Sequence, residues 1–237
     1  MTDVKGSVAL VTGGSRGIGE ALVQVLYERG AAKVYATARN AKAINHPDAV
    51  PLALEVTDQQ SVAAAVAAAP DVTILINNAG VSLGASFLDS PLDEIHREFE
   101  TNFFGPLHLT RAFVPVLERN GSGHILNMHS VLSWFTTPGA EAYSASKAAL
   151  WSQTNALRLA LRPRGINVTG LHVGYVDTDM TAGLEVPKIT PQRVAQLALD
   201  GIEADAPEVL ADEITRQVKA GLSADLTALY PQLAADA

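Results

Sequence analysis

The sequence predicts an α/β fold, with a single doubly wound parallel sheet and helices on both of its faces. Short apolar segments alternate with longer helical patterns along most of the chain. The short segments carry Val, Ile and Leu at successive positions, which is typical of strands that are buried on both sides. A regular strand–helix alternation places the strands in one parallel sheet with right-handed crossovers.

Six strands and five helices follow from these patterns. The expected strands are Val8–Val11, Lys33–Thr37, Val50–Leu54, Val72–Ile76, His124–Met128 and Ile166–His172. The expected helices are Gly17–Arg29, Gln59–Ala69, Leu92–Glu118 with an interruption near Asn102, Ala142–Leu161 and Pro191–Gly201. The last helix has a clear start, because Thr190 can cap it and Pro191 suits a first helical position.

No linker, internal repeat or shift in composition divides the chain, so residues 1–237 are expected to form a single domain. The tail, residues 205–237, is harder to assign. Pro207–Asp212 could form a short final strand, and Glu213–Leu222 and Ala224–Tyr230 are interpreted as surface or interface helices.

The composition excludes several classes of function. The chain has 17 Lys and Arg against 25 Asp and Glu, a net charge of −8, and no basic cluster, so a nucleic-acid partner is not expected. It has no cysteine, which excludes disulfides and thiolate chemistry. The apolar run that begins at Val8 is interpreted as a strand and not as a signal peptide, and no run is long enough to span a membrane. A cytoplasmic protein without a metal site is expected, because no His, Asp and Glu cluster has metal-ligand spacing.

A glycine-rich loop follows the first strand and opens the first helix. It has the sequence Thr12-Gly13-Gly14-Ser15-Arg16-Gly17-Ile18-Gly19. Glycines allow the sharp turn and let a pyrophosphate approach the free N–H groups at the helix start. Many glycine clusters are plain turns, but between the first strand and the first helix of a βαβ unit this one indicates a dinucleotide site.

The end of the second strand indicates which dinucleotide binds. An NAD site usually has an acidic residue there for the ribose 2′-hydroxyl, whereas this chain has Ala38 followed by Arg39. Arg16, inside the glycine loop, could join Arg39 on a 2′-phosphate. The sequence therefore predicts NADP(H), against the alternative that both arginines are ordinary solvated side chains.

Tyr143 and Lys147 are four residues apart near the start of a helix, so they share one helical face. A free phenol titrates near pH 10, and a neighbouring ammonium favours the phenolate. We expect Lys147 to lower the pKa of Tyr143 into a range useful for acid/base catalysis. Alone, this spacing is more often a solvated helix face.

Other polar residues favour a catalytic role for Tyr143 and Lys147 over a solvated helix face. Ser130 lies just after the fifth strand, Asn78-Ala79-Gly80 follows the fourth, and Asn102 lies in the long helical segment. Strand ends face the ligand crevice in this architecture. These residues, in this order from Val8 to about Gly201, resemble the short-chain dehydrogenase/reductase family, in its compact classical type.

The resemblance implies a role for each matched residue. Tyr143 would transfer the proton, and Lys147 would lower its pKa and bind the nicotinamide ribose. Ser130 would polarise the substrate carbonyl, and Asn102 would position a water next to Lys147. Further cofactor contacts are implied for Asn78, Ala79, Gly80, Glu55, Val56, Val176 and Thr178.

Two positions depart from the family pattern. Glu55 stands where Asp or Asn is usual, so its adenine contact could come from the backbone alone. Val173 replaces a usual proline before Gly174, which leaves the rigidity of that loop in doubt.

The substrate is expected to be a small carbonyl or alcohol compound. Val131, Trp134 and Tyr175 are candidate lining residues beside Ser130 and Tyr143, although Trp134 could equally be ordinary core. If Trp134 lines the site, an apolar or aromatic ketone fits better than a sugar. His129 is assigned no role.

Several alternatives stay open. A 3-oxoacyl thioester is the second candidate substrate, a non-catalytic NADP(H)-binding sensor is a different class of function, and an epimerase or dehydratase usually has a longer chain. By resemblance, the segments 103–117 and 142–161 would pair across a two-fold axis in a homodimer, or in a homotetramer. Trp151, Leu150 and Leu157 could serve either that interface or the core.

Overall fold

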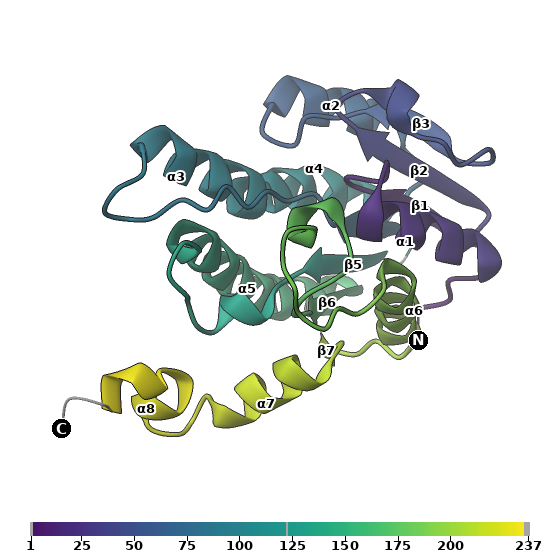
Figure 1. Ribbon diagram of the computed structural model, residues 1–237. Coiled ribbons are helices and arrows are strands. Elements are labelled where there is room, and N and C mark those ends of the chain that lie inside the picture. The colour runs from purple at the N-terminus through teal and green to yellow at the C-terminus, as the bar shows by residue number, and fades with distance from the viewer. Residues whose placement is uncertain (1, 122, 235–237) are drawn as a thin grey trace.

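The computed structural model describes residues 2–121 and 123–234; Met1, Ser122 and residues 235–237, which the predicted single domain also includes, lie outside this range. Its centre is one parallel seven-stranded sheet with the strand order β3-β2-β1-β4-β5-β6-β7 (Figure 1). The strands are β1 (Val8–Val11), β2 (Lys33–Ala38), β3 (Val50–Ala53), β4 (Ile74–Asn77), β5 (Gly123–Met128), β6 (Ile166–His172) and β7 (Glu208–Leu210). The predicted doubly wound sheet is confirmed.

The helices agree with the predictions to within a few residues, apart from the segment around Asn102 and the tail. They are α1 (Gly17–Glu28), α2 (Gln59–Ala68), α3 (Leu92–Phe99), α4 (Gly105–Arg119), α5 (Glu141–Leu161), α6 (Pro191–Glu203), α7 (Glu213–Gly221) and α8 (Leu226–Leu229). The expected interruption near Asn102 is a single π-helical turn, Glu100–Phe104, which joins α3 directly to α4. The final strand exists but is shorter than expected, and the second tail helix is reduced to one turn.

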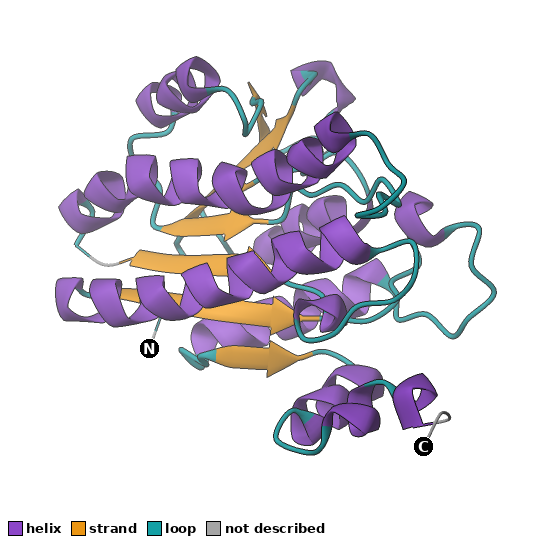
Figure 2. Ribbon diagram, turned by 90° about the vertical axis from the view of Figure 1, so that its left-hand side faces the viewer, coloured by secondary structure: helices purple, strands orange, loops and turns teal. Residues whose placement is uncertain are grey.

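Two apolar cores hold the helices against the sheet. Ala9 and Val11 of β1 face the core shared with α1 and α6, whereas Leu10 between them faces the core shared with α2 and α4. This alternation is the period of two that a strand imposes on its side chains. Figure 2 shows long helices running along the sheet, and α4 contributes the fully buried Phe113 and Leu117 to that face. Each such side chain contributes about 1.5–3 kcal/mol relative to an exposed one.

The strand order changes direction at β1, and this determines where a ligand can bind. β1 pairs with β2 on one side and with β4 on the other, so the connections diverge at the carboxyl ends of β1 and β4. Ligands of open α/β sheets bind in the crevice at such a point. The glycine loop follows β1, Asn78 follows β4 and Ser130 lies just after β5, so all three meet at this edge.

In Figure 1 the chain after β7 runs below this edge strand of the sheet. There α7 and α8 lie apart from the two main helix layers. Asp212 caps α7 by accepting a hydrogen bond from the Thr215 N–H at 2.9 Å. In the described part of the chain, we find no helix with the length and apolar character that crossing a bilayer requires.

Candidate active site

The glycine loop has the conformation that a phosphate cradle needs. Gly13 and Gly17 have φ angles of +67° and +55°, in the left-handed region that L side chains rarely adopt. A Cβ at Gly19 would lie 2.0 Å from the Gly13 carbonyl oxygen, so this position accepts no side chain. Ser15 is half-buried in the loop, and Ile18 packs against the core between α1 and α6.

Thr12 ties this loop to the segment that follows β4. Its hydroxyl accepts hydrogen bonds from the Asn78 N–H at 2.8 Å and the Ala79 N–H at 2.9 Å. The Asn78 side chain returns a bond to the Thr12 carbonyl oxygen at 2.8 Å. The sequence placed Thr12 in the loop without giving it this function, because only the pairing of β1 with β4 brings the two segments together.

The arginines expected at the 2′-phosphate lie at the same end of the sheet. Ala38 ends β2, and Arg39, which follows it, is exposed. Arg16 pairs with Asp179 at 2.9 Å, and both side chains are 76% exposed. Such an exposed pair contributes about 0–1 kcal/mol, so an anionic ligand could compete for Arg16 at little cost.

The segment after β6 folds back over the glycine loop. A Cβ at Gly17 would lie 3.2 Å from the Thr178 methyl group, which places Thr178 against the start of α1. Val176 is buried and forms a bridge with Ile189. The cofactor residues expected from β1 and from β6 are therefore brought together.

Ser130 and Tyr143 come from different elements and meet. Ser130 follows β5 and caps a short helical turn by accepting a hydrogen bond from the Leu132 N–H at 3.1 Å. Tyr143 lies in the first turn of α5, and its phenol lies close enough to the Ser130 side chain for that hydroxyl to lower the pKa of the phenol. A carbonyl oxygen between two such hydroxyls would find two donors.

The electrostatics of Tyr143 differ from the expectation. Burial raises the pKa of the phenol to about 12, although the Ser130 side chain acts in the opposite direction. The expected decrease in the pKa of Tyr143 is wrong for this structure, because burial of the phenol raises its pKa more than the Ser130 side chain lowers it. Lys147 Nζ lies 5.8 Å from the centroid of the Tyr143 ring and donates a hydrogen bond to the Met128 carbonyl oxygen at 2.8 Å.

Burial also acts on Lys147, and it lowers the pKa of the ammonium to about 8. The side chain is 5% exposed. The two groups are therefore shifted toward their neutral forms, a phenol and an amine, which is the usual effect of a site with little water.

Asn102 lies in the π-helical turn and is fully buried. Its side chain accepts from the Val81 N–H and donates to the Val81 carbonyl oxygen, both at 2.9 Å. It also donates to the Ser146 hydroxyl at 3.0 Å. A Cβ at Gly80 would lie 3.1 Å from Asn102 Oδ1 and 3.7 Å from Lys147 Nζ, so these three residues surround one small space.

Glu98 is a buried acid at this site that the sequence did not single out. It lies one helical turn before Asn102 and has no exposed surface. One carboxyl oxygen accepts the Leu83 N–H at 2.5 Å, and the other has no hydrogen-bond partner among the described residues. Burial raises the pKa of Glu98, and its charge in turn raises that of Tyr143. A helical pattern rich in Glu and Arg gave no signal that this one acid faces inward.

The predicted adenine contacts lie after β3. Val56 is buried, and its methyl group would lie 2.9 Å from a Cβ at Gly105. The Glu55 carboxylate accepts hydrogen bonds from the N–H and the hydroxyl of Thr57. Its side chain is thus engaged within its own turn, which leaves a backbone contact to adenine as the prediction.

The loop after β6 has supports that substitute for the missing proline. Val173 is buried, and its carbonyl oxygen accepts from the Val131 N–H at 2.9 Å. The Gly174 N–H donates to the Asp212 carboxylate at 2.7 Å. A Cβ at Gly174 would lie 2.6 Å from Ile214, so the start of α7 closes tightly over this loop.

The three candidate substrate residues have different environments. Val131 is buried next to Ser130, and Tyr175 is 40% exposed. Trp134 stacks on His172 with ring centroids 4.0 Å apart, and Lys219 Nζ lies 5.0 Å from the centroid of its ring. Its contribution to substrate binding stays a prediction.

The residues proposed for a helix–helix interface differ in their burial and in their contacts. Leu150 is 1% exposed and belongs to the interior, and Leu157 packs against the core that includes α4. The ring of Trp151 packs edge to face against that of Trp134, with the ring centroids 6.2 Å apart.

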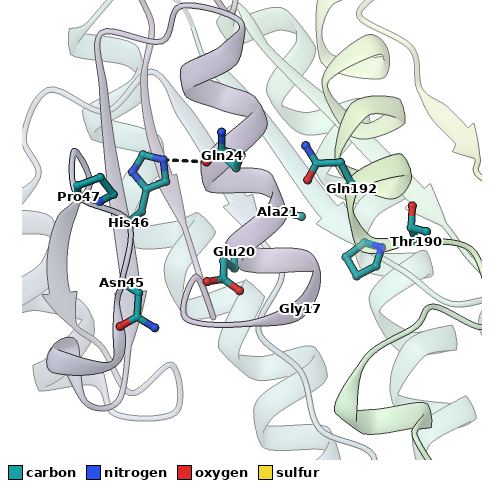
Figure 3. Close-up of a pocket in the computed structure, with 10 residues that line it drawn as sticks. Gly17, Glu20, Ala21, Gln24, Asn45, His46, Pro47, Thr190 and Gln192 are labelled. Carbon is teal, nitrogen blue, oxygen red and sulfur yellow. Dashed lines mark hydrogen bonds between the residues drawn. The ribbon is translucent and has the colours of Figure 1, made fainter.

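A cleft of about 630 Å³ lies away from these residues, between α1, the loop at His46 and the start of α6. In Figure 3, His46 reaches toward Gln24 of α1, while Thr190 and Gln192 lie on the opposite wall. The cleft shares Gly17 with the phosphate loop but is lined by none of the four expected catalytic residues. The cleft is therefore separate from the candidate catalytic residues.

Comparison with known proteins agrees with this geometry. Residues 7–188 match the family described as short chain dehydrogenase. An uncharacterised oxidoreductase of Staphylococcus epidermidis is 34% identical over 209 residues, which cover 82% of this chain and 90% of the relative.

Solved structures give the same result. A short chain dehydrogenase from Burkholderia cenocepacia in complex with NADP is 36% identical, with a TM-score of 0.93 over 98% of this chain and 99% of the other. The NADPH-bound carbonyl reductase from chicken fatty liver is 30% identical, with a TM-score of 0.76 over 84% and 91%. The chain belongs to the short-chain dehydrogenase/reductase family of oxidoreductases.

Proposed function

We propose that the protein is an NADP(H)-dependent oxidoreductase that reduces a ketone or aldehyde, or oxidises the corresponding alcohol, with Tyr143 as the acid/base. One observation carries this proposal: the hydroxyls of Tyr143 and Ser130 meet at the carboxyl edge of the sheet, one helical turn from the buried Lys147. Two hydroxyls and an ammonium suit the oxygen of a carbonyl group that gains negative charge.

The glycine loop fits the cofactor, because Gly19 has no room for a side chain and Gly13 and Gly17 turn the backbone toward the start of α1. The pyrophosphate would be held by this loop, and the remaining contacts would come from the segments after β2, β3, β4 and β6. When bound, NADPH supplies the hydride that a carbonyl carbon accepts.

The protein's part is to move a proton and to hold the oxygen. In reduction, the Tyr143 phenol gives its proton to the substrate oxygen while Ser130 donates a hydrogen bond to it; in oxidation, Tyr143 takes the proton back. The raised pKa of Tyr143, about 12, keeps the resting phenol protonated and supports the reducing direction. Lys147, whose pKa is lowered to about 8, can exchange protons near neutral pH.

The preference for NADP(H) is part of the same proposal. Ala38 leaves space where an acid would repel a 2′-phosphate, and Arg16 and Arg39 supply positive charge. A relative of 36% identity binds NADP, which supports this choice. Replacing both arginines by Ala should raise the KM for NADPH at least tenfold more than the KM for NADH, about 1.4 kcal/mol of selective binding. Equal increases for the two cofactors would contradict it.

An apolar or aromatic substrate is proposed because the segments after β4 and β6 expose apolar side chains. Phe87 and Leu88 are 52% and 94% exposed, and Met180 and Leu184 are 54% and 45% exposed. Exposed apolar groups of this size often mark a binding surface. We also propose a homodimer through α4 and α5, because Phe104, which directly precedes α4, and Leu159 of α5 are exposed. Sedimentation at micromolar concentration distinguishes a dimer from a monomer or a tetramer.

Replacement of Tyr143 by Phe tests the chemistry, since it removes the proton and keeps the ring. Turnover of NADPH with a panel of apolar ketones and aldehydes should fall by about 10²–10⁴-fold. The dissociation constant for NADPH, measured from its fluorescence, should stay within about twofold, because the pyrophosphate contacts do not change. Near-normal turnover would exclude Tyr143 as the acid.

The same panel separates the alternatives. Turnover restricted to 3-oxoacyl thioesters would select the thioester reductase. Tight NADPH binding without turnover of any carbonyl compound would favour the non-catalytic sensor.

A further inference from the structure

The tail after β7 is attached to the loops that carry the site. In the described structure, Asp212 accepts the Gly174 N–H after β6, and the Tyr230 hydroxyl accepts the Thr136 N–H at 3.0 Å. Thr136 belongs to the segment after Ser130 in which the candidate substrate residues lie. These bonds join α7 to the loop after β6 and the segment after α8 to the loop after β5, and both loops carry candidate substrate residues.

Lys219 is the central residue of this attachment. Its ammonium pairs with Glu208 of β7 at 2.8 Å and lies 5.0 Å and 5.3 Å from the ring centroids of Trp134 and Trp151. Glu208 also accepts the Trp151 indole N–H at 3.1 Å. An ammonium at this distance from an indole ring is attracted to it, and Lys219 is held in place by the carboxylate.

The indole of Trp134 contacts both Lys219 and the ring of His172, which lies next to Ser130. One side of Trp134 stacks on His172, at 4.0 Å between centroids and 15° between planes. The His172 ring stacks in turn on His129 at 4.6 Å, and its Nδ1 lies 3.4 Å from the Ser130 carbonyl oxygen. A Cβ at Gly170 would lie 2.9 Å from the His129 ring, so the stack has little freedom to shift.

We propose that Lys219 is a positioning residue for the substrate pocket: it holds Trp134 on His172, fixes the segment 131–136 beside Ser130, and so makes the tail after β7 a determinant of which carbonyl compounds bind. This inference rests on the proposed reductase function. Lys219 itself touches neither the cofactor residues nor the catalytic hydroxyls, so it acts through Trp134.

Lys219→Met tests the proposal, since it keeps the length of the side chain and removes the charge. The KM for an aryl alkyl ketone should rise roughly three- to tenfold, the size expected for one cation–π contact. The KM for NADPH should stay within about twofold, because the glycine loop is unaffected. Lys219→Arg, which keeps the charge over the ring, should restore the KM, and Gln217→Met on the exposed side of the same helix should not change it.

Tryptophan fluorescence gives a second measurement that needs no activity. The chain has only two tryptophans, so Trp151→Phe leaves Trp134 as the sole indole. In that background, Lys219→Met should increase quenching of Trp134 by acrylamide, and Lys219→Arg should not. Unchanged quenching would overturn the positioning role, and altered quenching with an unchanged ketone KM would overturn the role in substrate choice. An enzyme without ketone turnover would refute the proposed function, while quenching would still test whether Lys219 holds Trp134.

Discussion

The buried ammonium of Lys147 is needed for the proposed chemistry and is unfavourable for folding. Its pKa is about 8 in the folded chain, compared with 10.5 for a free lysine, so the folded state resists its charge. Below pH 8 Lys147 is protonated in both the folded and the unfolded chain, and its burial lowers the free energy of unfolding by the full amount. Between pH 8 and 10.5 only the unfolded chain keeps the proton, and stability rises with pH.

We therefore expect Lys147→Met to raise the free energy of unfolding of the cofactor-free protein at pH 7 by about 1–3 kcal/mol. The gain should vanish above pH 10.5 and should be accompanied by loss of turnover. Urea unfolding at the two pH values measures it, with the exposed Lys42→Met as the control. A lower stability of Lys147→Met at pH 7 would mean that the bond to the Met128 carbonyl outweighs burial.

Tyr143 shows how far one residue could be predicted from the sequence. The spacing to Lys147 correctly placed both groups at one end of a helix, because helical geometry is local. The pKa could not be predicted in this way, since it depends on burial in the folded chain and on Glu98, an acid 45 positions earlier in the sequence. Spacing describes neighbours along the chain, whereas hydration depends on the whole fold.

At the scale of elements, the π-helical turn between α3 and α4 has a clear consequence. The wider turn lets Asn102 bond both backbone groups of Val81 and still reach Ser146 of α5. Such turns are frequent at functional sites. The sequence predicted an interruption near Asn102 but could not predict its form, which depends on contacts with the segment after β4.

The conformation of the glycine loop leads to a testable prediction about Gly19. Gly19→Ala places a methyl group 2.0 Å from the Gly13 carbonyl oxygen, so the loop must distort at the start of α1. The dissociation constant for NADPH should rise at least tenfold, about 1.4 kcal/mol. Gly183→Ala is the matched control, because a Cβ there has no neighbour within 4 Å. NADPH fluorescence titration measures both, and equal affinities would refute the cradle.

For the whole molecule, the strand alternation was sufficient to predict the sheet and its ligand edge. The tail was not predictable in the same way. Lys219 belongs to no pattern in the sequence, and its proposed function depends on its contact with Trp134, which lies 85 positions earlier in the chain. Contacts between distant segments without a period or a motif become visible only in the folded chain.

The folded molecule also contains buried histidines that make its stability depend on pH. Burial lowers the pKa of His124 and of His172 to about 4, from 6.5 for a free histidine, and that of His129 well below 6.5. Above pH 6.5 all three are neutral in both states, and their full contribution to stability is present. As the pH falls from 6.5 toward 4, only the unfolded chain takes up these protons, so stability falls.

His124 and His172 should therefore each cost about 2 kcal/mol of stability between pH 7 and pH 5. His124, whose ring bonds Thr2 and Thr169, is suited to the test because it lies far from the catalytic hydroxyls. In His124→Asn, the difference in unfolding free energy between pH 7 and pH 5 should be smaller than in the parent by about 2 kcal/mol. His96→Asn, at an exposed position of α3, should leave the difference unchanged. If both variants keep the parent's pH dependence, His124 is not neutral in the folded protein, and the acid sensitivity must come from other groups.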